Sequence, residues 1–118
     1  MTAELKEFVT AKLNDLIAAP CCCAEARQAA EEWLAASGTE NENEQTEKLL
    51  KELEEDIEPI DDLVAFTESD TAVRLFGEER AKQFAVHARE LKASGAKYCD
   101  CPACAACAAI LEKKGELL

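Results

Sequence analysis

Residues 49–66 read LLKELEEDIEPIDDLVAF, and this stretch decides the fold class. Its apolar side chains recur mostly at intervals of three and four residues, which places them along one face of an α-helix. Pro59 interrupts the run, because proline lacks the N–H that a helix interior needs and its ring clashes with the preceding turn. The apolar face keeps its phase across Pro59, so the pattern predicts a kink or a break into two helices. The apolar positions are Leu49, Leu50, Leu53, Ile57, Ile60, Val64 and Phe66.

Two helices are expected before this stretch. Thr2 is a suitable N-cap for the first helix, whose apolar positions in residues 5–17 follow helical spacing. Pro20 suits the first turn of the second helix, where a missing N–H leaves no hydrogen bond unmade, and Gly38 ends that helix. Trp33 is expected to pack in the core.

Three further helices are expected after it. Ser69 caps a short helix that Gly77 closes, and a longer helix then runs to Ser94. The last helix begins near Pro102 and ends before Gly115. No segment alternates with the period of two that a β-strand requires.

These patterns predict an all-α protein. A chain of 118 residues is long enough for one modest core. We therefore expect a single helical domain over residues 1–118, a bundle of about five helices with short connections. Its cysteine-rich segment 98–114 is expected to pack on the bundle.

The chain is strongly acidic, since 13 lysines and arginines against 25 aspartates and glutamates give a net charge of −12. That charge repels phosphate backbones and argues against nucleic-acid binding. No stretch has the roughly 20 apolar residues of a membrane span. Glu4, Lys6 and Glu7 interrupt any signal-peptide core. We expect a cytoplasmic protein, with no membrane partner, in a compartment that keeps thiols reduced.

The chain has seven cysteines but only one histidine and one methionine. Any metal binding or redox chemistry is therefore expected to use cysteine thiolates. They form two groups, Cys21–Cys23 and the stretch Cys99-Asp-Cys-Pro-Ala-Cys-Ala-Ala-Cys107. Full pairing of an odd number is impossible, so a metal site or redox chemistry is favoured over a disulfide framework. No motif for an enzyme accompanies them, and the chain is predicted to be non-enzymatic.

Both groups lie at helix starts that a proline marks. Pro102 at the first helical position makes Cys101 the N-cap, and the helix dipole is expected to favour ionisation of Cys101 and Cys104. Cys22 and Cys23 follow Pro20 and are expected to ionise readily for the same reason. Two such starts in one small bundle could share a thiolate site.

The spacing of the cysteines along the chain indicates which of them could bind one zinc ion. Cys101 and Cys107 are separated by a helical rise of roughly 9 Å, which is too long for one Zn²⁺ with Zn–S bonds of about 2.3 Å. The predicted zinc site therefore uses Cys99, Cys101 and Cys104, with a fourth ligand from Cys22 or Cys23 and with Cys107 in reserve.

Two other readings of the cysteines stay open. Cys101-x2-Cys104-x2-Cys107 matches the first three positions of a bacterial iron–sulfur ligand run, but position 111 is leucine. Cys101-x2-Cys104 also has the spacing of a thiol–disulfide switch, without the βαβ context of thioredoxin. A redox protein is thus the alternative to a zinc protein, and an interaction module with merely packed cysteines is the second alternative. An unknown protein partner and any oligomeric state are compatible with the sequence.

Residues 53–66 (LEEDIEPIDDLVAF) and 96–104 (AKYCDCPAC) resemble a family of small bacterial all-helical proteins. These proteins often carry the label of heat-shock or ninety-kilodalton-type molecular chaperone. The similarity covers nearly the whole chain, and the second segment is its most distinctive part. The resemblance implies a small cytoplasmic protein without catalytic residues. The chain has no glycine-rich ATP-binding motif of the large chaperone.

Overall fold

The computed structural model describes residues 1–118, whose secondary structure is helical apart from one β-bridge between Pro59 and Tyr98. The all-α prediction is confirmed, whereas a number of about five helices was too low. Pro59 separates two helices and the short helix after Ser69 is a distinct element, both as the sequence allowed, while a short helix at Lys114–Leu117 was not expected. No helix combines the length and the apolar composition that crossing a bilayer requires. The eight helices are α1 (Ala3–Ala18), α2 (Ala24–Ala36), α3 (Glu42–Asp56), α4 (Ile60–Thr67), α5 (Asp70–Phe76), α6 (Glu78–Ala93), α7 (Pro102–Leu111) and α8 (Lys114–Leu117).

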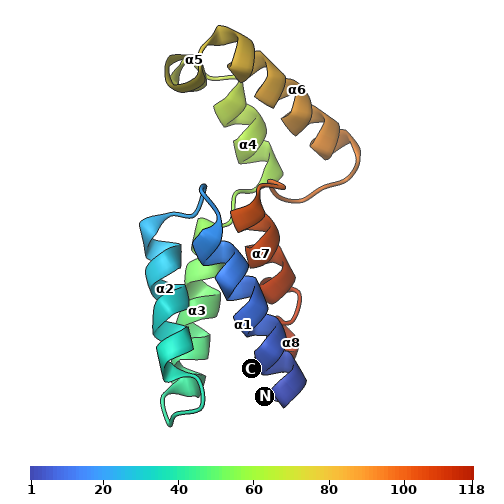
Figure 1. The fold of residues 1–118 in the computed structure, drawn as a ribbon. Coiled ribbons are helices and arrows are strands. Elements are labelled where there is room, and N and C mark those ends of the chain that lie inside the picture. Colours follow the sequence, from blue (N-terminus) through green and yellow to red (C-terminus); the bar gives the residue numbers. More distant parts are fainter. The chain divides into compact units, whose positions relative to one another are not determined.

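The chain forms two compact units, and the first contains Met1–Ile57 and Asp100–Leu118. In this unit α1, α2, α3 and α7 lie side by side (Figure 1). α1 packs against α2 and α7, and α3 packs against the same two helices, so segment 98–114 contributes a full member of the bundle. The core of the unit includes Val9, Leu13, Leu16, Ala30, Trp33, Leu49, Leu50, Leu53 and Ile110.

The connection between α1 and α2 differs from the expected one. Pro20 follows Ala19 in a tight turn, which the N–H of Cys22 closes on the carbonyl of Ala19 at 3.2 Å. α2 begins only at Ala24, with the side chain of Cys23 as its N-cap. Placing Pro20 in the first turn of α2 was therefore wrong. The fixed φ of proline suits the second position of such a turn as well as a helix start.

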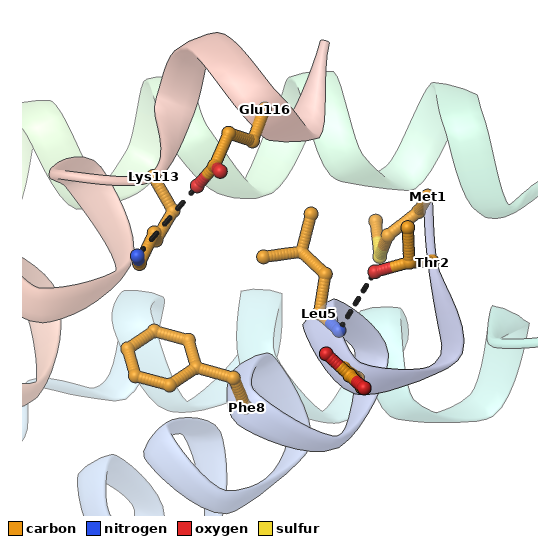
Figure 2. Close-up of a pocket in the computed structure, with 7 residues that line it drawn as sticks. Met1, Thr2, Leu5, Phe8, Lys113 and Glu116 are labelled. Carbon is orange, nitrogen blue, oxygen red and sulfur yellow. Dashed lines mark hydrogen bonds and ion pairs between the residues drawn. The ribbon is translucent and has the colours of Figure 1, made fainter.

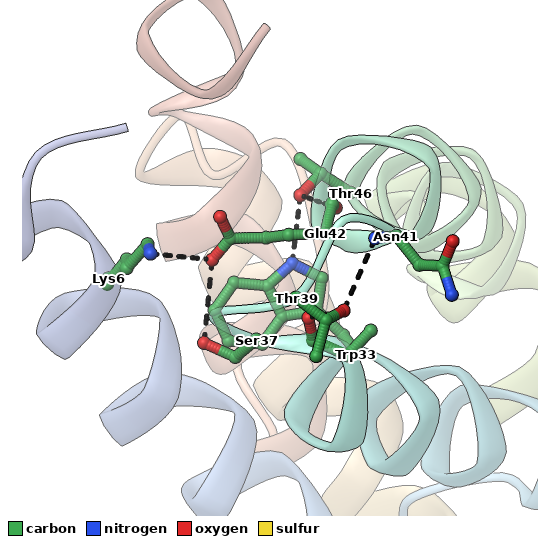
Figure 3. A network of polar contacts seen from close by, with 8 residues as sticks. Lys6, Trp33, Ser37, Thr39, Asn41, Glu42 and Thr46 are labelled. Carbon is green, nitrogen blue, oxygen red and sulfur yellow. Dashed lines mark hydrogen bonds and ion pairs between the residues drawn. The ribbon is translucent and has the colours of Figure 1, made fainter.

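A polar network joins α1, α2 and α3 near the α2–α3 connection (Figure 3). The indole N–H of Trp33 donates to Oγ1 of Thr46 at 2.9 Å, and this hydroxyl donates to the carbonyl of Glu42 at 2.8 Å. Lys6 of α1 forms an ion pair with the Glu42 carboxylate at 3.1 Å. Trp33 and Thr46 are both buried. Their polar atoms have hydrogen-bond partners, as buried polar groups in stable proteins do.

The second unit, Glu58–Cys99, contains α4, α5 and α6. Ser69 caps α5 as predicted, because its hydroxyl accepts the N–H of Ala72 at 3.3 Å. Gly77 has a φ of 86°, which residues with a Cβ rarely adopt, and it turns the chain from α5 into α6. The prediction of one domain over the whole chain stays a prediction. Edge-to-face ring contacts in this unit join Phe66 to Phe76 and Phe76 to Phe84.

Candidate metal centre

Three cysteines converge just before and within the first turn of α7. The sulfur atoms of Cys99, Cys101 and Cys104 all lie within 4.8 Å of one another. They belong to six consecutive residues, so their proximity is a property of this one stretch of chain. Sulfur ligands around a tetrahedral Zn²⁺ with bonds of about 2.3 Å lie about 3.8 Å apart. The three thiols are therefore close to the spacing that one metal ion requires.

The start of α7 explains this convergence. Cys101 is the N-cap, with an extended backbone at ψ 157°, and its sulfur accepts the N–H of Cys104 at 3.4 Å. The N-cap predicted at Cys101 is thus confirmed. The backbone before it is held in place because the N–H of Cys99 donates to the carbonyl of Glu58 at 2.9 Å. Cys99 and Cys101 are half-buried, and Cys104 is buried.

The turn between α1 and α2 brings the other cysteine group to the same end of the first unit. The sulfur of Cys21 interacts by hydrogen bonding with the backbone of Ala103 and with the thiol of Cys101. Cys21 therefore lies at the N-terminus of α7, although the sequence pointed to Cys22 or Cys23 as the additional ligand. Spacing along the chain could not show this meeting, because some eighty residues separate the two groups.

A small cavity of about 60 Å³ lies beside this contact. Leu16, Ala26 and Ala103 form its apolar wall. Its remaining lining is rich in metal-ligating side chains, which come from the turn between α1 and α2, the end of α3 and the first two turns of α7. These are Cys21, Cys22, Cys23, Asp56, Cys104 and Cys107.

The electrostatic surroundings of the cavity disfavour thiolates when no cation is bound. Burial raises the pKa of Cys107 to about 12, and the negative charges of Cys22 and Asp56 add to that shift. Burial also raises the pKa of Cys23, although the N–H of Ala26 acts in the opposite direction. The pKa of Cys22 is raised as well, again by burial first, against the opposing charge of Arg27.

These directions correct one prediction. Cys22 and Cys23 were expected to ionise more readily than an ordinary thiol because of their place near a helix start. Cys23 does cap α2, but desolvation together with the nearby carboxylate of Asp56 outweighs the effect of the helix amides. Only Cys23 is at the N-cap, since the turn at Pro20 holds Cys22 before the helix.

Asp56, like Cys21, lines the cavity but was not among the ligands that the sequence predicted. It is the last residue of α3 and lies in an acidic run, where its neighbours Glu54 and Glu55 are exposed. Its Oδ2 atom is buried and accepts no hydrogen bond. The sequence carried no signal that distinguishes it from the other carboxylates, because its burial depends on the approach of the α1–α2 turn and α7.

A larger hollow on the first unit lies away from the cysteines, between the start of α1 and α8 (Figure 2). Its volume is about 680 Å³, and Phe8 forms part of its wall beneath the ammonium group of Lys113, which is 5.8 Å from the ring centroid. The hydroxyl of Thr2 in this hollow is already engaged as the N-cap of α1, at 3.1 Å from the N–H of Leu5. No cysteine or histidine lines it. This hollow therefore offers no thiolate or imidazole ligand for a metal.

No protein-family model, curated protein or solved structure matches this chain. The resemblance to the chaperone-labelled family consequently stays a prediction. The function has to be argued from the geometry of the cysteines.

Proposed function

We propose that this protein is a non-enzymatic helical protein that binds Zn²⁺ through cysteine thiolates at the start of α7. The convergence of Cys99, Cys101 and Cys104 within 4.8 Å carries the proposal. Thiolates are preferred ligands of zinc, and three of them in one short stretch supply most of a tetrahedral site. The chain's one histidine, His87, lies outside this stretch.

Cys21 is the best-supported fourth ligand. Its sulfur already interacts with Cys101, one of the three converging thiols. Four cysteines around zinc leave no open position for substrate or water, which is typical of a structural rather than a catalytic site. Such a site would fasten the α1–α2 turn to the start of α7, two segments that are far apart in the sequence.

Metal analysis tests this function directly. Protein purified without oxygen and without added metal is expected to contain zinc by mass spectrometry. Replacing Cys101→Ser should lower the content by one ion per chain, because it removes a central ligand. Ala105→Ser is the matched control, since Ala105 is an exposed position on the same helix and the change leaves every thiol in place. Zinc-free parent protein, or equal zinc in Cys101→Ser and the parent, would contradict the proposal.

The contact between Cys21 and Cys101 also favours a second candidate, a thiol switch. Oxidation would break two S–H bonds and form one S–S bond, with two protons released and two electrons passed to an oxidant such as glutathione disulfide. Peptide mapping after equilibration in glutathione buffers distinguishes the candidates. A Cys21–Cys101 disulfide that forms at cytosolic redox potentials in zinc-loaded protein would favour the switch. Protection of both thiols by bound zinc would favour the metal site.

A further inference from the structure

The cavity beside the first group of thiols has ligands that the site at the start of α7 does not use. Cys22 and Cys23 reach it from the α1–α2 turn, Cys107 from the second turn of α7, and Asp56 from the end of α3. Cys107 is close enough to the other three to interact with each of them electrostatically. Four potential ligands from three separate elements thus face one small space.

The geometry of α7 separates one of these ligands, Cys107, from Cys101 of the first site. Cys107 lies six residues beyond Cys101, a rise of roughly 9 Å along the helix, so the two cannot bind the same Zn²⁺ with bonds of about 2.3 Å. Cys21 and Cys104 line the cavity and also belong to the first site, so the two sets of ligands adjoin there. The chain's seven cysteines and Asp56 thereby divide into two sets of four.

Asp56 gives an independent indication that a cation belongs in the cavity. Its Oδ2 atom is buried and accepts no hydrogen bond, although a buried carboxylate oxygen normally has a donor. The side chain of Glu52, one turn earlier on α3, hydrogen-bonds with that of Asp56, and this contact, followed by burial and the charge of Asp56, raises the pKa of Glu52. Arg27 is the cation that acts on Cys22, and it lies outside the cavity lining. A metal ion among these groups would supply both the missing partner of Oδ2 and the missing positive charge.

We infer that the first unit holds a second zinc-type site, in which Cys22, Cys23, Cys107 and Asp56 bind one divalent cation inside the cavity. The cavity of about 60 Å³ exceeds the space that a single small ion or water occupies. Three thiolates and one carboxylate are a ligand set for Zn²⁺, or for Co²⁺ as its spectroscopic substitute, rather than for Mg²⁺ or Ca²⁺. The site is additional to the one proposed at the start of α7, and its ligand set rests on the proposal that Cys21 is the fourth ligand there.

Anaerobic titration of the metal-free, reduced full chain with Co²⁺ tests this inference. Thiolate-to-cobalt absorption should saturate at two ions per chain. Cys107→Ala should bind one, because it removes a ligand of the second set only, and alanine keeps a small apolar side chain at this buried position. Cys101→Ser should also bind one, through the other set. Two ions in the Cys107→Ala protein would overturn the second site.

Asp56→Asn provides a second test that does not depend on a core substitution. Asparagine preserves the shape of the side chain but lowers its charge, so cobalt affinity at the second site should fall at least tenfold and the visible d–d bands of that ion should shift. Glu55→Gln is the matched control, because it removes one negative charge from an exposed position of the same helix and leaves the cavity lining unchanged. Equal effects of Asp56→Asn and Glu55→Gln would show that only general electrostatics is involved, and the site would be refuted.

The stoichiometries separate failure of this inference from failure of the proposed function. A single ion in the parent that disappears in Cys101→Ser and persists in Cys107→Ala would refute the second site and leave the first. A single ion with the opposite pattern would refute the first site and support the second. Far-ultraviolet circular dichroism of each variant checks that the helices are intact.

Discussion

Buried polar groups differ between the two ends of the first unit. Near the α2–α3 connection, the Trp33 N–H and the Thr46 hydroxyl are buried and hydrogen-bonded in sequence to each other and to Glu42. At the cysteine end, a carboxylate oxygen of Asp56 is buried without a donor, beside thiols whose pKa values are raised. The first end is fully hydrogen-bonded within the protein, whereas the second has a buried oxygen for which the proposed cation would be the partner.

This difference suggests different roles for the two ends: the Trp33 end stabilises the fold, and the cysteine end is the candidate for metal binding. A satisfied network rigidifies a core and needs nothing from outside. A buried carboxylate oxygen with no partner lowers the stability of the fold. Such oxygens are rare in proteins, and a bound ion is one explanation for them. The comparison therefore predicts that substitutions at the Trp33 end act whether or not metal is present, while effects at the cysteine end depend on metal.

The largest effect is expected at the Trp33 end, near the α2–α3 connection. Trp33→Ala should lower the free energy of unfolding by about 3–5 kcal/mol, because it removes a large, fully buried side chain. Trp33→Phe should cost less, since it keeps most of the packed ring. Urea denaturation with and without chelator is the measurement. A loss in Trp33→Ala that vanishes when metal is removed would break the proposed separation of the two ends.

Loss of zinc from the site at the start of α7 should have the next largest effect. If zinc at 100 times its dissociation constant binds the folded chain alone, that loss should lower the free energy of unfolding by about 2.7 kcal/mol. Thermal unfolding of parent and Cys101→Ser proteins, with and without chelator, measures this contribution. The chelator should destabilise the parent more than the variant. An equal response of the two proteins would show that Cys101 holds no metal.

Removal of the Thr46 hydroxyl at the Trp33 end should lower the free energy of unfolding by a smaller amount. Thr46→Val should cost about 1–3 kcal/mol, because valine has nearly the same shape but leaves the buried Trp33 N–H without an acceptor. Thr46→Ser is the matched control, since it keeps the hydroxyl and loses only a methyl group. Chemical denaturation should rank serine above valine in stability. The reverse order would mean that packing, not the hydrogen bond, determines the role of Thr46.

The smallest expected effect concerns alkaline pH in metal-free, reduced protein. The pKa of Cys107 is about 12 in the folded chain, against an ordinary value of 9.0, so the folded state binds the proton more tightly than the unfolded state does. The resulting stability is present below pH 9.0 and is lost as the pH rises from there toward about 12.

Denaturation of the parent and of Cys107→Ala at several pH values between 8 and 10.5 tests this linkage. The free energy of unfolding should decline more steeply with pH in the parent, because alanine has no proton to lose. Parallel curves for the two proteins would show that Cys107 is as readily ionised in the folded chain as in the unfolded one.

Local sequence signals predicted most of the helices. The caps at Thr2, Ser69 and Cys101 were identifiable because an N-cap involves residues within one turn of each other. The break at Pro59 was likewise a local consequence of proline. Pro20 was wrongly assigned to the first turn of α2. The fixed φ of proline fits a turn and a helix start equally well, so the packing around Pro20 determines which of the two forms.

The sequence by itself determined the helical class, the buried faces and the convergence of Cys99, Cys101 and Cys104, because these features depend on residues within a few positions of one another. Only the tertiary structure decided which distant groups meet. It placed Cys21 against Cys101, and it enclosed Asp56 with Cys107 at the cysteine cavity. These contacts result from the packing of α1, α3 and α7, and no local sequence pattern predicts them. The direction of the thiol pKa shifts was decided there too, since desolvation is a property of the packed cavity rather than of the helix start.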